Sequence, residues 1–344
     1  MPKLQFNPGQ VSKRLVQNLP DRSRDVVVSR FGLGAKKRSE TLDAIGKRYG
    51  ITRERVRQIE NHAIKLIQDS HALAKEAAAF GSLENAIREL GGILPEDKLL
   101  DEFAKDEEAK NNLYFLLVVG KPFNVAKANN DFKTRWFVDP DLAKRVEEAL
   151  KQVHSTVKPS EILPEDKLVE HVLSCLTQVS AKYRNKDVVR QYLELSNCLR
   201  RNPLGEWGKP DAPGIRVKNI RDHAYFALKR HGSPMHFREV ARAIGKYFGK
   251  DAHEATTHNE LIKDPRFVLV GRGIYALKEW GYRAGPVVEI IKHILKESGP
   301  LSREEIMKRV AKERYVKENT ILVNLQNPAF LKIGGRYALK PSHN

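Results

Sequence analysis

Apolar side chains recur at helical spacing in residues 41–60, and the members of this pattern are Leu42, Ile45, Ile51, Val56 and Ile59. Spacings of three to four residues place side chains on one face of a helix, so the pattern predicts two short helices around one core. Thr41 and Thr52 are expected to cap their amino ends, and Gly50 is expected at the turn between them. Gly46 is small where the helices approach. The pattern predicts a helix-turn-helix.

The flanking residues extend this unit in both directions. Residues 21–31 form an amphipathic pattern that follows Pro20, which predicts a helix. Residues 30–40 (RFGLGAKKRSE) are predicted to be a basic loop. The second helix of the motif is expected to continue to about Ser70.

Two internal repeats organise the rest of the chain. The heptapeptide ILPEDKL occurs at residues 93–99 and again at 162–168, each time with proline at an expected helix start. Residues 264–278 (DPRFVLVGRGIYALK) resemble residues 327–340 (NPAFLKIGGRYALK), and both predict two short strands around a glycine turn. Such a hairpin after three helical segments is the winged-helix plan.

We therefore predict a mainly α-helical protein, in which a helix-turn-helix is followed by tandem small winged-helix-like units with short β-hairpin wings. The second repeat is degenerate in sequence, and residues 202–214 within it are expected to be loop. The expected divisions are 1–70, 71–155, 156–215, 216–283 and 284–344.

Charge points to a polyanionic partner. The 344 residues carry a formal net charge of +18. Residues 1–70 hold 15 Lys and Arg against 7 Asp and Glu, and residues 161–344 hold 33 against 21, whereas residues 71–160 hold 13 against 15. Double-stranded DNA is the first candidate for the basic parts, and the middle is expected to be a spacer or a protein-contact surface.

Several other classes of site lack support in the sequence. Cys175 and Cys198 fit neither a disulfide framework nor a zinc motif, and a cytoplasmic setting is expected. His253 and His258 are five residues apart, unlike the histidines of HExxH, so no metal is expected. We expect no cofactor, small-molecule substrate, membrane span or catalytic site. Trp136 and Trp280 are expected to be packing anchors.

Polar side chains crowd the start of the second predicted helix, with Arg53, Glu54, Arg55, Arg57 and Gln58 mostly facing solvent. Arg, Glu and Gln are side chains that pair with guanine, cytosine and adenine edges in the major groove. The helix start is therefore the candidate DNA-reading surface.

The first 70 residues resemble the −35-reading C-terminal domain, region 4, of bacterial primary sigma factors, on the residues RFGL (30–33) and TLDAIGKRYGITRERVRQIE (41–60). The resemblance implies base reading by Arg53, Glu54 and Gln58. It implies phosphate contacts by Thr52, Arg55 and Arg57, and we add Thr41 and Arg38 as candidates. Residues 21–33 would match the surface that docks on the β-flap of RNA polymerase core.

The departures from that family also shape the prediction. Only about 20 residues precede the match, and nothing later resembles a domain that captures the −10 element. We therefore expect that the chain does not initiate transcription alone. In the loop before the motif, Lys36 and Lys37 are as compatible with a mobile charged loop as with DNA contact.

Residues 219–280 resemble a HARE-type winged helix, as in the polymerase delta subunit, on residues 220–246 and 267–278. Arg272 and Arg336 are candidate wing contacts to DNA.

The predicted function is sequence-specific DNA binding within the bacterial transcription apparatus, at a −35-like promoter element, with RNA polymerase as a second partner. One alternative is a delta-like accessory protein that competes with sigma for polymerase. Another is a reader in a DNA-modification or restriction system.

Overall fold

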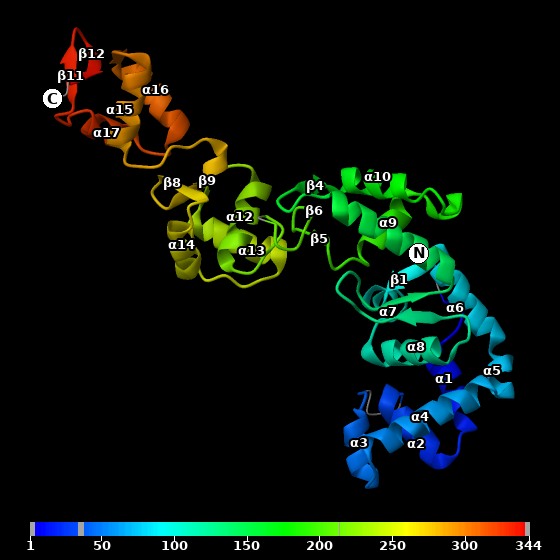
Figure 1. The fold of residues 1–344 in the computed structure, drawn as a ribbon. Helices are drawn as coiled ribbons and strands as arrows, with labels where there is room; N and C mark the ends of the chain where they lie inside the picture. Colours follow the sequence, from blue (N-terminus) through cyan, green and yellow to red (C-terminus); the bar gives the residue numbers. More distant parts are fainter. Residues whose placement is uncertain (1–3, 34–37, 213, 341–344) are drawn as a thin grey trace. The chain divides into compact units, whose positions relative to one another are not determined.

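The computed structural model describes residues 4–33, 38–212 and 214–340 and is mostly helical (Figure 1). It divides into two compact parts. The amino-terminal part comprises residues 1–201 and 206–215, and the carboxy-terminal part comprises residues 202–205 and 216–344.

Four helices open the amino-terminal part, namely α1 (Pro8–Gln17), α2 (Asp21–Phe31), α3 (Leu42–Tyr49) and α4 (Arg53–Gln68). The helix-turn-helix prediction for α3 and α4 is confirmed. Thr41 and Thr52 cap their amino ends, and Gly50 adopts a left-handed conformation at the turn, with φ of 63°. A side chain at Gly46 would place Cβ 2.7 Å from the Ile51 carbonyl oxygen, so only glycine allows this close approach.

The predicted apolar face packs as one small core. Its fully buried members are Val26, Ile45 and Val56, from α2, α3 and α4 respectively. Leu42, Tyr49, Ile51 and Ile59 pack against them. A core of this size stabilises little by itself.

Four winged-helix-like units follow, and all have the same element order of helix, strand, two helices and two strands. After the short α5 (His71–Lys75), the first unit contains α6 (Ala77–Glu89), β1 (Ile93–Pro95), α7 (Glu96–Phe103), α8 (Glu107–Val119), β2 (Asn124–Ala126) and β3 (Arg135–Phe137). The second contains α9 (Pro140–Thr156), β4 (Ile162–Pro164), α10 (Glu165–Cys175), the 3-10 turn η1 (Ala181–Tyr183), α11 (Lys186–Leu193), β5 (Arg200–Arg201) and β6 (Glu206–Gly208).

The carboxy-terminal part holds the other two units. The third contains α12 (Ile220–His231), β7 (Met235–His236), α13 (Phe237–Phe248), α14 (Glu254–Lys263), β8 (Phe267–Gly271) and β9 (Ile274–Leu277), and ends in the 3-10 turn η2 (Lys278–Trp280). The fourth contains α15 (Val287–Ser298), β10 (Leu301–Ser302), α16 (Arg303–Glu313), α17 (Glu318–Asn324), β11 (Phe330–Ile333) and β12 (Arg336–Leu339).

The β-sheets of the four units also share one topology. Each is antiparallel with three strands, and the last strand of each unit lies between the other two. The same register position pairs an aliphatic residue of the first strand with an aromatic residue of the last strand, as Leu94 with Trp136, Leu163 with Trp207, Met235 with Tyr275 and Leu301 with Tyr337. The third and fourth units thus extend the repeat seen in the two ILPEDKL copies.

The two ILPEDKL copies also keep a side-chain hydrogen bond. The Trp136 indole donates to Glu96 at 2.8 Å, and the Trp207 indole donates to Glu165 at 3.2 Å. Trp207 lies on β6, so the prediction that residues 202–214 are loop is wrong over this strand. A single buried tryptophan between turns gave too short an apolar run to indicate a strand.

Helix α9 packs against α10 and α11 in the core of the second unit. The predicted division at residue 155 left this helix with the first unit. We propose that the second unit begins at α9, since Leu142, Val146 and Val153 share its core.

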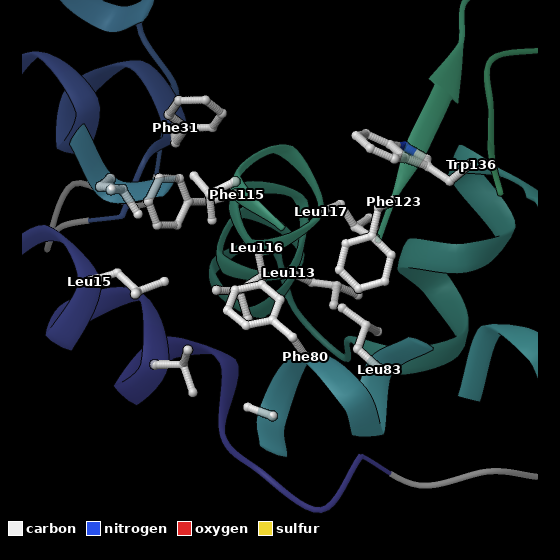
Figure 2. Packing of buried hydrophobic residues seen from close by; sticks show 14 of the residues in the cluster. Leu15, Phe31, Phe80, Leu83, Leu113, Phe115, Leu116, Leu117, Phe123 and Trp136 are labelled. Atoms are coloured by element: carbon white, nitrogen blue, oxygen red, sulfur yellow. The ribbon is translucent and has the colours of Figure 1, made fainter. Parts of the chain in front are cut away.

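The helix-turn-helix and the first unit share a larger core (Figure 2). Helix α8 lies in its centre, with Leu15 of α1 and Phe31 of α2 on one side and Phe80 and Leu83 of α6 on the other. The ring of Phe115 on α8 meets that of Phe31 edge-to-face, with 5.2 Å between centroids. Helices α1, α2 and α4 are therefore anchored by α8 and not by the small core of the helix-turn-helix alone.

Candidate nucleic-acid interface

The start of α4 projects a polar surface away from the helix-turn-helix core. Val56 is fully buried, while Arg53, Glu54, Arg57 and Gln58 are exposed around it. Because one buried residue per turn fixes the rotation of the helix, the neighbouring side chains must point outward. All three predicted base readers thus lie on the exposed side of one helix start.

The predicted readers differ in the partners they hold without DNA. Glu54 accepts hydrogen bonds from Arg57 at 2.7 and 2.9 Å, and these bonds lower the pKa of its carboxyl. Arg55 donates to Gln58 at 3.0 Å. Arg53 makes no ion pair within the part of the chain that the structure describes. Exposed intrahelical pairs are weak, so DNA can replace them at small cost.

The capping threonines offer hydrogen-bond donors at two helix starts. Thr41 Oγ1 accepts from the Ala44 amide, and Thr52 Oγ1 accepts from the Arg55 amide, each at 3.2 Å. A hydroxyl still has a hydrogen to donate, and helix amino ends favour anions. Both predicted phosphate contacts therefore have suitable chemistry.

A shallow pocket of about 420 Å³ lies beside Thr41 and is lined also by Arg30, Leu42, Asp43 and Arg53. Arg30 was not among the predicted site residues. Its guanidinium donates to the Glu40 carbonyl oxygen at 3.2 Å and lies 3.6 Å from Glu60. Its position at the head of the basic loop was the available signal, and the structure brings it to the edge of the helix-turn-helix.

A polar network braces α2 against α3. Arg48 contacts Asp25 at 2.9 Å and Glu40 at 3.0 Å. The Tyr49 hydroxyl donates to Asp25 at 2.5 Å, and this bond raises the pKa of Tyr49. The network fixes the first helix of the motif, on which the angle of α4 depends.

The remaining candidate contacts are scattered. Arg38 is exposed beside the helix-turn-helix, while Lys36 and Lys37 lie outside the described residues. Arg272 is exposed at the turn between β8 and β9. Arg336 is exposed on β12, one residue after the Gly334–Gly335 turn, and pairs with Ser302 across the sheet. Arg272 alone of these two wing residues lies at a turn.

Helix α2 lies in the segment 21–33 that was matched to the flap-docking surface, and its apolar side is covered within the chain. Val27 is fully buried and Phe31 is 6% exposed, both in the core centred on α8. A partner helix would have to displace α8 to reach these side chains.

Within the described residues, no group of three His, Cys, Asp or Glu side chains could hold a metal ion, and no helix has the length and apolar character to cross a membrane. The His258 ring stacks on Phe237 at 4.3 Å. Trp136 is 3% exposed, which fits the expected packing role.

One protein family matches the segment of the sequence that contains this site. Residues 15–69 match the family Sigma-70, region 4. The principal sigma factor HrdD of Streptomyces griseus is 41% identical over 66 residues, which are 19% of this chain and 20% of that protein. Sigma factor RpoS of Coxiella burnetii is 40% identical over 73 residues, 21% and 20% of the two chains. Sigma factor RpoD of Helicobacter pylori is 44% identical over 54 residues, 16% and 8%.

The chain spans a fifth or less of the length of these three relatives. The match covers the helix-turn-helix with its polar surface and ends at the last turn of α4. Residues 15–69 thus resemble region 4 of sigma-70 factors, a DNA-binding domain.

Proposed function

We propose that this protein binds DNA sequence-specifically, and that α4 reads a −35-like promoter element from the major groove. The observation that carries the proposal is the exposed start of α4, where Arg53, Glu54 and Gln58 surround a buried Val56 within the segment that resembles region 4. Base contacts by these three side chains would choose the sequence.

The proposed phosphate contacts surround this reader. Thr41, Thr52, Arg55, Arg57 and Arg38 would neutralise or hydrogen-bond the backbone on both sides of α4. Such contacts set the orientation and give a salt-dependent affinity without sequence information. If Arg57 leaves Glu54 and contacts a phosphate, the Glu54 carboxylate becomes free to accept a hydrogen bond from a cytosine amino group.

A panel of duplexes with single base-pair changes tests the reader. In Glu54→Ala, preference at one base pair should fall by roughly 5- to 150-fold, the equivalent of ~1–3 kcal/mol for one good base contact. Asp43→Ala is the matched control, since Asp43 is also exposed and pairs within its helix with Lys47, at 2.9 Å. Unchanged preference in Glu54→Ala would contradict base reading by this residue.

Polymerase binding is the second proposal, and the structure limits the form that it takes. Because α8 covers Val27 and Phe31, docking of a polymerase helix on the apolar side of α2 would require α8 to move. We propose that a polymerase contact uses exposed surface instead. A pull-down with polymerase core should therefore be insensitive to Phe31→Leu, which keeps an apolar side chain at this position.

Three assignments accompany the proposal. The third unit is proposed to be of HARE type, and Arg272 and Arg336 are proposed wing contacts. The five-part division of the chain is also proposed, with the second unit starting at α9.

A further inference from the structure

Both units of the carboxy-terminal part are basic, since residues 284–340 hold 11 Lys and Arg against 6 Asp and Glu, and the third unit holds more. Residues 216–283 hold 14 Lys and Arg against 7 Asp and Glu, whereas residues 77–139 of the first unit hold 8 against 11. The two units share one element order, so the fold does not require this difference. The excess charge in the third unit is available for a function.

The third helix and the wing of this unit carry little of that charge. Helix α14 has Glu254 and Glu260 and leaves the apolar Ile262 62% exposed. The wing is engaged within its own part of the protein, since the Tyr315 amide donates to the Val270 carbonyl oxygen of β8 at 2.7 Å. The first two helices, α12 and α13, together hold six Lys and Arg against two Asp and Glu, and so carry more than half of the excess.

Helix α13 carries a basic row. Arg238, Arg242 and Lys246 are exposed and spaced by four residues, which places them along one side of the helix. Arg238 is paired with Glu254 at 3.1 Å. Arg242 and Lys246 make no ion pair with any described residue, so their charges are free.

Helix α12 contributes a third cation, which packs over an aromatic ring of α13. Arg230 lies over the ring of Tyr247, 4.5 Å from its centroid, and Lys246 approaches the same ring at 6.0 Å. Such contacts orient a guanidinium without neutralising it. Lys250 is exposed just after Gly249, the C-cap of α13.

The surface is also open to close approach. A Cβ added at Gly245 or at Gly249 would meet no atom within 4 Å. The opposite side of α13 is buried through Val240 and Ile244, which fixes the helix on the unit. A rigid helix thus presents cations beside two residues that leave room for a polymer backbone.

We propose that Arg230, Arg242, Lys246 and Lys250, here called the α13 surface, bind the phosphate backbone of duplex DNA. The large apolar residues that this part of the protein exposes lie elsewhere, at Ile262, Leu269, Tyr315, Val323, Leu331 and Ile333. Protein interfaces need a buried apolar or aromatic centre, and membrane surfaces take apolar side chains. A surface of cations that lack ion-pair partners among the described residues and leave no large apolar side chain exposed is suited to a polyanion.

The contact is independent of sequence. Cations on phosphates position a protein without reading bases. The proposal rests on the DNA binding proposed above, but it does not require α4 to read bases. It adds a second binding surface, formed by side chains of α12, α13 and the residue that follows the C-cap of α13.

The test uses the full chain and a random-sequence duplex of 60 base pairs, with binding measured across a salt series. Arg242→Gln with Lys246→Gln keeps the side-chain stems and removes two charges. The slope of log K against log salt should fall in magnitude by about 2, since each phosphate contact contributes roughly 0.9. The control is Lys308→Gln with Lys312→Gln, another exposed pair spaced by four residues, on α16.

The outcomes separate this proposal from base reading by α4. The α13 double variant should keep the preference of the wild type for the specific duplex over the scrambled duplex. If the wild type itself shows no such preference, base reading by α4 is contradicted and the proposal for the α13 surface is not. An unchanged slope in the α13 variant overturns the proposal. An equal fall in the slope of the α16 control also overturns it, because this would show that charge spread over the whole surface determines the slope. A variant that loses polymerase binding while its DNA binding stays intact would overturn it as well. Thermal unfolding of both variants should match the wild type.

Discussion

Replacing Phe115 with alanine should lower the stability of α4, although the sequence predicts that Phe115 and α4 belong to different domains. Phe115 is fully buried on α8 and packs edge-to-face on Phe31 of α2. The carboxy-terminal half of α4 reaches the same core through Ala63 and Ile67. We therefore expect residues 4–139 to unfold cooperatively, with the helix-turn-helix as part of that unit.

The magnitude follows from the burial. Replacing a fully buried phenylalanine with alanine costs about 3–5 kcal/mol, which includes the cavity that remains. The small core around Val26, Ile45 and Val56 has too few buried side chains to compensate. At 1.4 kcal/mol per tenfold change, amide protection in α4 should fall by roughly 100- to 3,000-fold.

Hydrogen exchange at the amides of α4 is the assay. Phe115→Ala should lower protection in α4 and in α8 together. Phe226→Ala is the matched control, because Phe226 is 1% exposed in the third unit; it should leave α4 unchanged. Normal protection of α4 in Phe115→Ala, with α8 unprotected, would refute the shared core and show an independent helix-turn-helix.

Three further predictions are smaller in scope. Gly46→Ala should destabilise the helix-turn-helix and weaken DNA binding, because the new Cβ would lie 2.7 Å from the Ile51 carbonyl oxygen; thermal unfolding with α4 exchange measures this. Trp207→Phe should lower the free energy of unfolding by about 0.5–1.5 kcal/mol in a denaturant titration, since it removes the indole hydrogen bond to Glu165 while Arg190 and Arg201 still pair with that carboxylate. Burial raises the pKa of Asp264, but hydrogen bonds from Arg266 outweigh it and lower the pKa below 3.8; its stabilising effect should be present above about pH 4 and lost as pH falls below that value, a loss absent in Asp264→Asn.

The sequence was sufficient for the helix-turn-helix because its determinants are local. Thr41, Thr52 and Gly50 are capping and turn residues at fixed offsets, and the apolar spacing between them fits one face. The wings of the third and fourth units were predicted for the same reason, through glycine turns between alternating residues.

Long-range packing was beyond sequence reasoning. The apolar run on α8 indicated a core element, but nothing in its pattern identifies α1, α2 and α4 as its partners. The strand that contains Trp207 was missed because its pairing with Leu163, 44 positions earlier, makes it a strand. The division between the first and second units stays a proposal for a similar reason, since the sequence pattern of α9 allows packing in either direction.

The candidate site was predictable in composition but not in its internal contacts. Residue order indicated Arg53, Glu54 and Gln58 as readers, and the structure places all three on the exposed helix start. The pairing of Glu54 with Arg57 depends on side-chain geometry at spacing of three residues, which a sequence allows but does not select.

Fluorescence anisotropy with a duplex bearing a primary-sigma −35 hexamer, against a scrambled duplex, tests the central claim most directly. The measurement runs across a salt series, because phosphate contacts weaken with salt while base preference persists. The account predicts a preference for the hexamer that survives rising salt and disappears in Arg53→Ala and in Glu54→Ala. Equal, steeply salt-dependent binding to both duplexes would contradict it.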